Sequence, residues 1–306
     1  MPNANYAHNA TGGAISITRG APGNYTVKFG NPVWWIGEYG FAVTAYGSSR
    51  AVCQMRNHMT VGNTLTAYVF CFDRVTHALV DSRFTLLVVN SGSLNGRYAF
   101  AWADETMAPS YTPDPAFSYT SGPGSMLITH GPGNGDYTVN LGTGTTKHAT
   151  VLVNATYGFQ DVCKVGQWHS TTVQVLCFDS TGAPVNEYYW VLQLGTGGRG
   201  GRLGFAFADK STTPSYTPNL QYSYNSSGGA VTAMRTSTGT YMIDFEGLQK
   251  LPGHKENVQV TPWGNGTTTC KVVSWGNTAT ALRVNVECRK LNGNLGDARY
   301  NVLVIE

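Results

Sequence analysis

Apolar and polar residues alternate along most of the chain with a period of two, as in residues 25–29 and 283–288. Such alternation places successive side chains on opposite faces of a strand, with one face buried. No stretch carries the helical period over the length of an ordinary helix. The pattern therefore predicts an all-β protein made of many short strands.

The strand pattern repeats along the chain. The sequence Pro-Ser-Tyr-Thr-Pro at residues 109–113 recurs at 214–218, and the strand-like segment before it, residues 99–104, corresponds to residues 204–209. Internal repetition at a fixed period indicates a repeat architecture. We expect three units of about 100 residues, and the third lacks the final Phe-Ala-x-Ala-Asp strand of the other two. Their predicted boundaries are 2–112, 113–217 and 218–306.

Each unit divides further into two four-stranded modules of about 50 residues, which is the sequence form of a propeller blade. Three tandem repeats with two blades each predict a six-bladed β-propeller that closes into one domain. The Ala-x-Ala strands are expected at the innermost position, where small side chains let blades converge. The alternative is three tandem β-sandwich domains.

The six cysteines are distributed two to a unit. In each unit they lie on consecutive predicted strands joined by a hairpin, and neighbouring antiparallel strands bring Cβ atoms to disulfide distance. An even, repeated count is typical of an oxidising compartment, so we expect a secreted, extracellular protein. The predicted disulfides are Cys53–Cys71, Cys163–Cys177 and Cys270–Cys288.

Charge and hydropathy narrow the range of partners. Charged residues form 12% of the chain and the formal net charge is +3, which gives no reason to expect nucleic acid as a partner. No apolar run has the length of a membrane span. Residues 1–5 lack the basic start and apolar stretch of a signal peptide, so the sequence reads as a mature form or an excised segment.

The sequence offers no convincing catalytic, cofactor or metal site. The seven histidines occupy no common repeat position, and Cys-x-x-Cys spacing with nearby histidine does not recur. Asp104 and Asp209 end the Ala-x-Ala strands, where an aspartate ordinarily caps a turn; the alternative is a carboxylate pair for glycoside hydrolysis. We therefore expect a protein that is not an enzyme.

Aromatic side chains at recurring positions are the candidate ligand contacts. One set precedes a glycine in each unit, and the other follows the first cysteine by five residues. Flat rings among hydroxyl and amide side chains suit sugars, and the alternative is that the rings pack in the core. The Trp34-Trp35 pair could form an exposed aromatic patch. The six candidates are Tyr46, Tyr157, Trp263, His58, Trp168 and Trp275.

Several short sequence motifs resemble those of secreted bacterial β-repeat proteins with no established activity. These motifs are Phe-Ala-x-Ala-Asp, Pro-Ser-Tyr-Thr-Pro, Cys-Phe-Asp and the run Tyr-Ser-Tyr-Asn-Ser-Ser-Gly-Gly at residues 222–229. The resemblance spans nearly the whole chain. It implies export and a repeat fold, and it supplies no site residues.

These observations favour a non-catalytic extracellular recognition protein, with carbohydrate or a cell-surface polymer as its partner, because several equivalent weak sites raise avidity. The alternative is a structural or self-assembling surface protein, a homo-oligomer formed through the incomplete sheet edge. A secreted hydrolase on a propeller scaffold is the third interpretation.

Overall fold

The computed structural model describes residues 2–31, 38–92, 94–143, 148–157, 160–169, 171–196 and 201–306. The Trp34-Trp35 pair lies outside the described residues. The all-β prediction is confirmed: strands dominate, and the helical segments are three short 3₁₀ turns. No helix within the described ranges is both long enough and apolar enough to cross a membrane.

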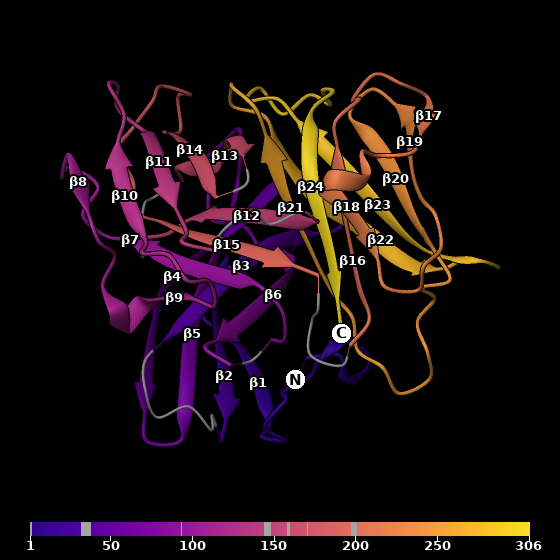
Figure 1. Ribbon diagram of the computed structural model, residues 1–306, viewed down its shortest axis with the longest axis horizontal. Coiled ribbons are helices and arrows are strands. Elements are labelled where there is room, and N and C mark those ends of the chain that lie inside the picture. The colour runs from indigo at the N-terminus through magenta and orange to yellow at the C-terminus, as the bar shows by residue number, and fades with distance from the viewer. Residues whose placement is uncertain are drawn as a thin grey trace.

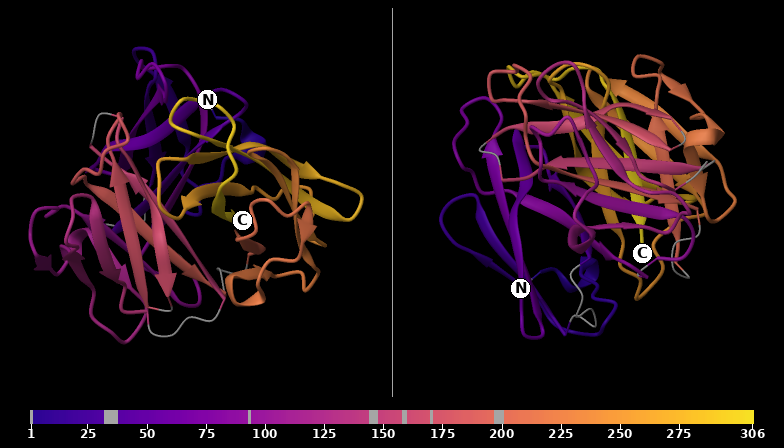
Figure 2. Two further views of the ribbon diagram at one scale, coloured as in Figure 1. Left: turned by 90° about the horizontal axis from the view of Figure 1, so that it is seen from above. Right: turned by 60° about the vertical axis from the view of Figure 1, so that its left-hand side comes forward.

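The strands form three lobes around a common centre, each with an outer and an inner sheet layer (Figures 1 and 2). Lobe 1 has the outer order β1-β2-β5-β4 and the inner pair β3-β6. Its elements are η1 (Ala4–Tyr6), β1 (Ile15–Arg19), β2 (Asn24–Gly30), β3 (Tyr39–Tyr46), β4 (Ala51–Val61), β5 (Thr64–Asp73) and β6 (Arg83–Asn90).

Lobe 2 has the outer order β8-β10-β11-β14-β13 and the inner order β12-β15-β7-β9. Its elements are β7 (Tyr98–Ala103), β8 (Ser110–Tyr111), η2 (Pro115–Phe117), β9 (Ser118–Thr120), β10 (Leu127–His130), β11 (Asp136–Asn140), β12 (Ala149–Ala155), β13 (Val162–His169), β14 (Thr172–Phe178) and β15 (Tyr189–Gly195).

Lobe 3 has the outer order β17-β19-β20-β23-β22 and the inner order β21-β24-β16-β18. Its elements are β16 (Leu203–Ala208), β17 (Ser215–Tyr216), η3 (Leu220–Tyr222), β18 (Ser223–Asn225), β19 (Val231–Ser237), β20 (Thr240–Glu246), β21 (Asn257–Trp263), β22 (Thr269–Asn277), β23 (Ala281–Arg289) and β24 (Arg299–Ile305).

The sheets continue from one lobe into the next. The outer sheet of lobe 2 joins the inner sheet of lobe 3 through the parallel pair Val165–Trp263, which makes one nine-stranded sheet. Val272–Tyr46 joins lobe 3 to lobe 1 in a seven-stranded sheet, and a Met55–Thr156 bridge joins lobe 1 to lobe 2. Sheets of this size and connection are not six four-stranded blades, so the propeller prediction is not confirmed in the described part of the chain.

Strands β3, β12 and β21 converge at the centre and contact one another. A polar side chain on each of them hydrogen-bonds the backbone of the neighbouring strand, so the three contacts close a cycle. The bonds are Asn154 Nδ2 to the Val43 carbonyl at 2.8 Å, the Val260 amide to Thr44 Oγ1 at 3.1 Å and the Val153 amide to Thr261 Oγ1 at 3.1 Å. Because the Val153 and Val260 amides are buried, pairing them avoids the cost of desolvated polar atoms, and the three bonds together fix how the lobes meet.

The Ala-x-Ala strands are not innermost, contrary to the sequence-based expectation. Ala99, Ala101 and Ala103 of β7 are fully buried between the two layers of lobe 2, and Ala206 of β16 lies in the equivalent core of lobe 3. The opposite face of these strands carries Tyr98, Phe100, Leu203 and Phe205, which fill the central core between the lobes. Small residues therefore let the two layers of each lobe pack closely, while large ones hold the lobes together.

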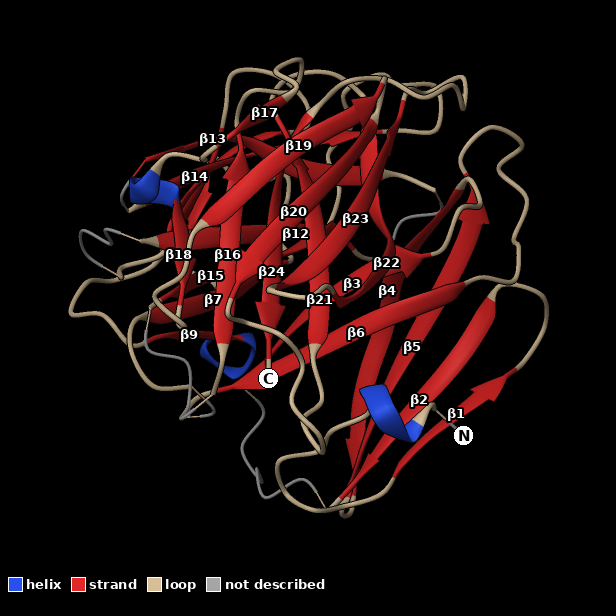
Figure 3. Cartoon of the chain, turned by 90° about the vertical axis from the view of Figure 1, so that its right-hand side faces the viewer, coloured by secondary structure: helices blue, strands red, loops and turns tan. Residues whose placement is uncertain are grey.

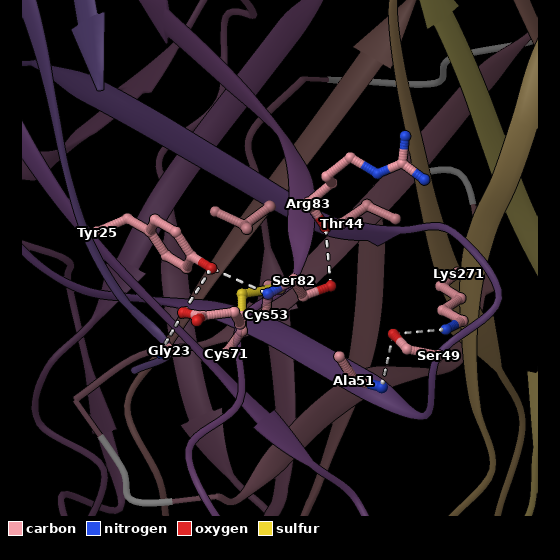
Figure 4. Close-up of a disulfide and its surroundings, with 12 residues drawn as sticks. Gly23, Tyr25, Thr44, Ser49, Ala51, Cys53, Cys71, Ser82, Arg83 and Lys271 are labelled. Carbon is pink, nitrogen blue, oxygen red and sulfur yellow. Dashed lines mark hydrogen bonds between the residues drawn. A yellow bond between two sulfur atoms is a disulfide. The ribbon is translucent and has the colours of Figure 1, made fainter. Parts of the chain in front are cut away.

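The three predicted disulfides are confirmed. Each joins directly opposed residues of two antiparallel outer strands, with a Cα–Cα distance of 4.1 Å. Around Cys53–Cys71, the Tyr25 hydroxyl accepts a hydrogen bond of 2.9 Å from the Ser82 amide (Figure 4). Three disulfides and no free cysteine indicate an oxidising, extracellular environment.

Candidate binding site

Two of the three lobe interfaces hold a complete aromatic cluster of the same construction. Each combines a ring from the outer sheet of one lobe with rings from the inner strands and the 3₁₀ turn of the next lobe. The six candidate rings from the sequence are divided among all three lobe interfaces, two at each. Each of these rings contacts another aromatic ring at its interface, so the recurring positions contribute to packing between lobes.

At the interface of lobes 1 and 2, Trp102 of β7 stacks on Tyr157 with ring centroids 5.7 Å apart, and His58 lies 5.6 Å from Phe117. Burial lowers the pKa of His58 to about 4, so this imidazole is neutral at pH 7. Tyr157 is 42% exposed and donates to Asn57 Oδ1 at 2.9 Å. These side chains line a cavity of about 180 Å³.

At the interface of lobes 2 and 3, Trp168 lies 5.1 Å from Tyr222, and Phe207 of β16 lies 5.1 Å from Trp263. The Arg299 guanidinium covers the Trp263 ring at 4.1 Å from its centroid. Trp168 is only 6% exposed, whereas Phe207, Tyr222 and Trp263 are partly exposed.

The interface of lobes 3 and 1 is built differently. Trp275 meets both Tyr6 and Tyr46 at 5.2 Å, and the Arg83 guanidinium covers Tyr46 as Arg299 covers Trp263. The aromatic position that Trp102 and Phe207 occupy in the other two interfaces has no counterpart among the described residues of lobe 1. Those two rings belong to β7 and β16, which pair with the inner strands β15 and β24. In lobe 1, β6 pairs with β3 alone within the described ranges.

A groove of about 580 Å³ runs along the free side of β6. Its walls are β6 on one side and residues 7–9 on the other, and Ile15 and Ile17 of β1 and Phe29 of β2 form its apolar floor. Trp275 and Glu306 also line it. We call this cavity the β6 groove; among the elements that line it, Figure 3 shows η1, β1 and β2 lying below β6 in that view. Its volume is typical of ligand-binding clefts.

The strand register shows how β6 corresponds to β24. Arg83 pairs with Tyr46, and Arg299 pairs with Trp263. Because Tyr46 and Trp263 make the equivalent parallel bridges between lobes, Val88 corresponds to Val304. Val304 is 1% exposed, whereas Val88 is partly exposed. Phe84 and Leu86 on β6 are also partly exposed. Their counterparts on β24, Tyr300 and Val302, are completely buried.

Residues 7–9 hold the place that β9 and β18 hold in the other lobes. They follow the 3₁₀ turn η1, whose N-cap Asn3 corresponds to Asp114 of η2 and Asn219 of η3. Asn9 Nδ2 donates to the Gly30 carbonyl at 2.9 Å, as Asn225 Nδ2 donates to Glu246 at 2.7 Å. In lobes 2 and 3 one strand, β7 or β16, lies between the corresponding segments. The β6 groove is therefore one strand wide.

The difference between the lobes follows from the chain order. Strands β7 and β8 lie in the predicted unit 2–112 but pair in lobe 2, and β16 and β17 lie in unit 113–217 but pair in lobe 3. Each of these units thus supplies two strands to the next lobe. Comparison of the three repeats in the sequence places the missing strand in the third unit, but the sheet that lacks this strand belongs to lobe 1. Without the pairing between lobes, the side chains of the groove could not be identified from sequence.

A third and smaller cavity, of about 50 Å³, lies where β3, β12 and β21 meet the disulfides. Burial lowers the pKa of Lys164 and of Lys271 to about 8. Lys164 Nζ donates to the Gly266 carbonyl at 3.0 Å, and Lys271 lies 3.9 Å from Glu287. The volume suits a few water molecules, and the lysines have protein partners.

No group of three or more histidine, cysteine, aspartate or glutamate side chains in the described ranges is arranged to hold a metal ion. Comparisons of the chain with protein-family models, with curated proteins and with solved structures found no match.

Proposed function

We propose that this protein is a non-catalytic extracellular recognition protein that binds an extended polypeptide in the β6 groove. The observation that carries the proposal is that the groove occupies the position filled by a strand in both other lobes. Within the described ranges, the side of β6 that faces away from β3 offers backbone donors and acceptors, of which the Leu86 carbonyl already accepts from Asn257 Nδ2 at 2.8 Å, and the groove offers apolar surface beside them. Strand addition uses these two features together: main-chain bonds supply affinity and side-chain pockets supply selectivity.

Display of a random peptide library tests this function directly. Bound peptides should protect from hydrogen exchange those backbone amides of residues 84–89 that point away from β3, since the alternate ones already bond that strand. The variant Val88→Lys, which places a charge in the groove, should lose binding, whereas Val61→Lys should retain it. Val61 is 63% exposed on β4 and does not line the groove, so it controls for an added lysine on a strand. If no peptide protects residues 84–89, the groove is not a strand-binding site.

A second candidate function is carbohydrate binding in the 180 Å³ cavity between lobes 1 and 2. It is favoured by the exposed Tyr157 ring and by the buried Trp102 indole N–H, which has no hydrogen-bond partner among the described residues. A sugar could stack on the tyrosine and accept from the indole. Binding on a glycan array should be lost in Tyr157→Ala and retained in Tyr46→Ala. Equal binding by both variants, or none by the original protein, would exclude this cavity.

A further inference from the structure

We infer that the strand recognised by the β6 groove runs antiparallel to β6 and alternates small residues with aromatic ones. This inference rests on the proposed function and names the chemistry of the partner. It follows from the two strands that fill the equivalent position elsewhere, β7 and β16, and from the surfaces that β6 and its neighbours present.

The register assigns a residue type to each position along β6. Gln193 and Val304, which correspond to Val88, pair with Ala99 and Gly204. One residue further along, Leu192 and Leu303 correspond to Leu87, and both pair with phenylalanine. The alternation continues, so the partner should place small residues opposite Val88, Leu86 and Phe84, and large ones opposite Leu87 and Thr85.

Close packing between the two layers of each lobe explains the small positions. A Cβ atom added to Gly204 would lie 2.8 Å from side-chain atoms of Leu248 and Phe245. In lobe 1 the corresponding face of the groove is closed by Ile15, Ile17 and Phe29. A large side chain on that face of the partner strand would force the two layers apart.

The lobe interface explains the aromatic positions. Trp102 and Phe207 pair with the residues that correspond to Thr85; Trp102 contacts Tyr157, just after β12, and Phe207 contacts Trp263 of β21. At the interface of lobes 3 and 1, Tyr46, Trp275 and Tyr6 are already in place. An aromatic residue opposite Thr85 would complete this cluster as it is completed elsewhere.

Charge favours an acidic residue at the end of the partner strand. The residue after the last small position would lie beside Arg83, which is exposed at the end of β6. In both internal strands the residue at this place is an aspartate, Asp104 or Asp209. An opposite charge at an exposed position contributes little affinity but fixes direction and register.

A second copy of this chain is a poor donor. Its own strands of this type are already engaged on both sides, β7 between β15 and β9 and β16 between β24 and β18. Phe100 and Phe205 are completely buried. Donating either strand would open a lobe of the donor, so the partner is a different polypeptide with a free segment of this pattern.

Binding of a labelled synthetic peptide tests the inference. The peptide carries the sequence of residues 202–209, Arg-Leu-Gly-Phe-Ala-Phe-Ala-Asp. We expect it to bind at least tenfold more tightly than a scrambled peptide and than peptides in which Ala206→Leu or Phe207→Ala has been made. Binding should be lost in the protein variant Val88→Lys and kept in Val61→Lys.

The outcomes separate this inference from the proposed function. If library peptides protect residues 84–89 but the 202–209 peptide binds no better than its scrambled control, the alternating pattern is wrong and strand addition stands. If no peptide protects β6, both fail. A concentration-dependent dimer that protects residues 84–89 without added peptide would show that a second copy occupies the groove and would overturn the inference.

Discussion

Val88 and Val304 occupy equivalent positions, so the difference in unfolding free energy between their alanine variants reports whether the groove beside Val88 is open. The two residues lie on β6 and β24, but a neighbouring strand covers only Val304. Replacing Val304 with alanine removes two buried methyl equivalents and leaves a cavity, which should cost about 2–3 kcal/mol. Val88→Ala should cost about 1 kcal/mol, because its side chain is already partly in water and the groove leaves no closed void.

The assay is urea-induced unfolding of both alanine variants, alone and with a saturating groove peptide. Without peptide, Val304→Ala should lower the free energy of unfolding by about 1–2 kcal/mol more than Val88→Ala. With peptide bound, the two costs should converge, because Val88 is then covered as Val304 is. The peptide should accordingly bind Val88→Ala about tenfold more weakly than the original protein. Equal costs in the absence of peptide would refute the reasoning, since they would mean that Val88 is already enclosed.

Three further predictions concern the central network, the interface of lobes 1 and 2, and a buried carboxyl group of lobe 2. Thr44→Val should cost about 2 kcal/mol of unfolding free energy in urea, because it leaves the Val260 amide and the Gln259 carboxamide without this partner; a cost below about 0.5 kcal/mol would contradict the central network. Because the folded pKa of His58, about 4, lies below its ordinary 6.5, its contribution to stability is present above pH 6.5 and is lost as the pH falls towards 4. The original protein should therefore lose up to about 3 kcal/mol more than His58→Phe between pH 7 and 4, and parallel pH profiles would rule this out. Burial, and to a lesser extent a hydrogen bond to the Asp161 carboxyl group, together raise the pKa of Glu187 from 4.5 to about 8. Because the protonated form of Glu187 is favoured in the folded state, the free energy of unfolding should fall as the pH rises from 4.5 to 8. In thermal unfolding, Glu187→Gln should be more stable than the original protein at pH 8, and a larger advantage at pH 5 would contradict this sign.

Local sequence patterns were sufficient for the strands and the disulfides. A disulfide needs only two consecutive antiparallel strands in a register that opposes the cysteines, as at Cys163 and Cys177. The alternation of residues 283–288 likewise corresponds to a strand with one buried face, part of β23. These features depend on neighbours in the chain, which sequence periodicity reports directly.

The arrangement of the sheets depends on contacts that periodicity does not report. A single bridge such as Val272–Tyr46 joins strands more than 200 residues apart and turns separate modules into one sheet. The small residues of β7 were assigned to the centre because small size fits any crowded position, and only the pairing shows that they face the interior of lobe 2. The candidate rings show the same ambiguity, because a recurring aromatic residue is expected both where lobes pack together and where a ligand binds.

The most direct test of the central claim is to supply the strand covalently. A copy of residues 196–217 would be appended after Glu306, which lines the groove and corresponds to Gly195, the residue before that sequence. The control carries Gly204→Asp and Ala206→Asp in the appended copy. If the groove is a strand site, the fused chain should unfold at higher urea than the control, with amides 84–89 protected from exchange. Identical unfolding of the two fusions, with those amides exchanging as in the original chain, would contradict the account.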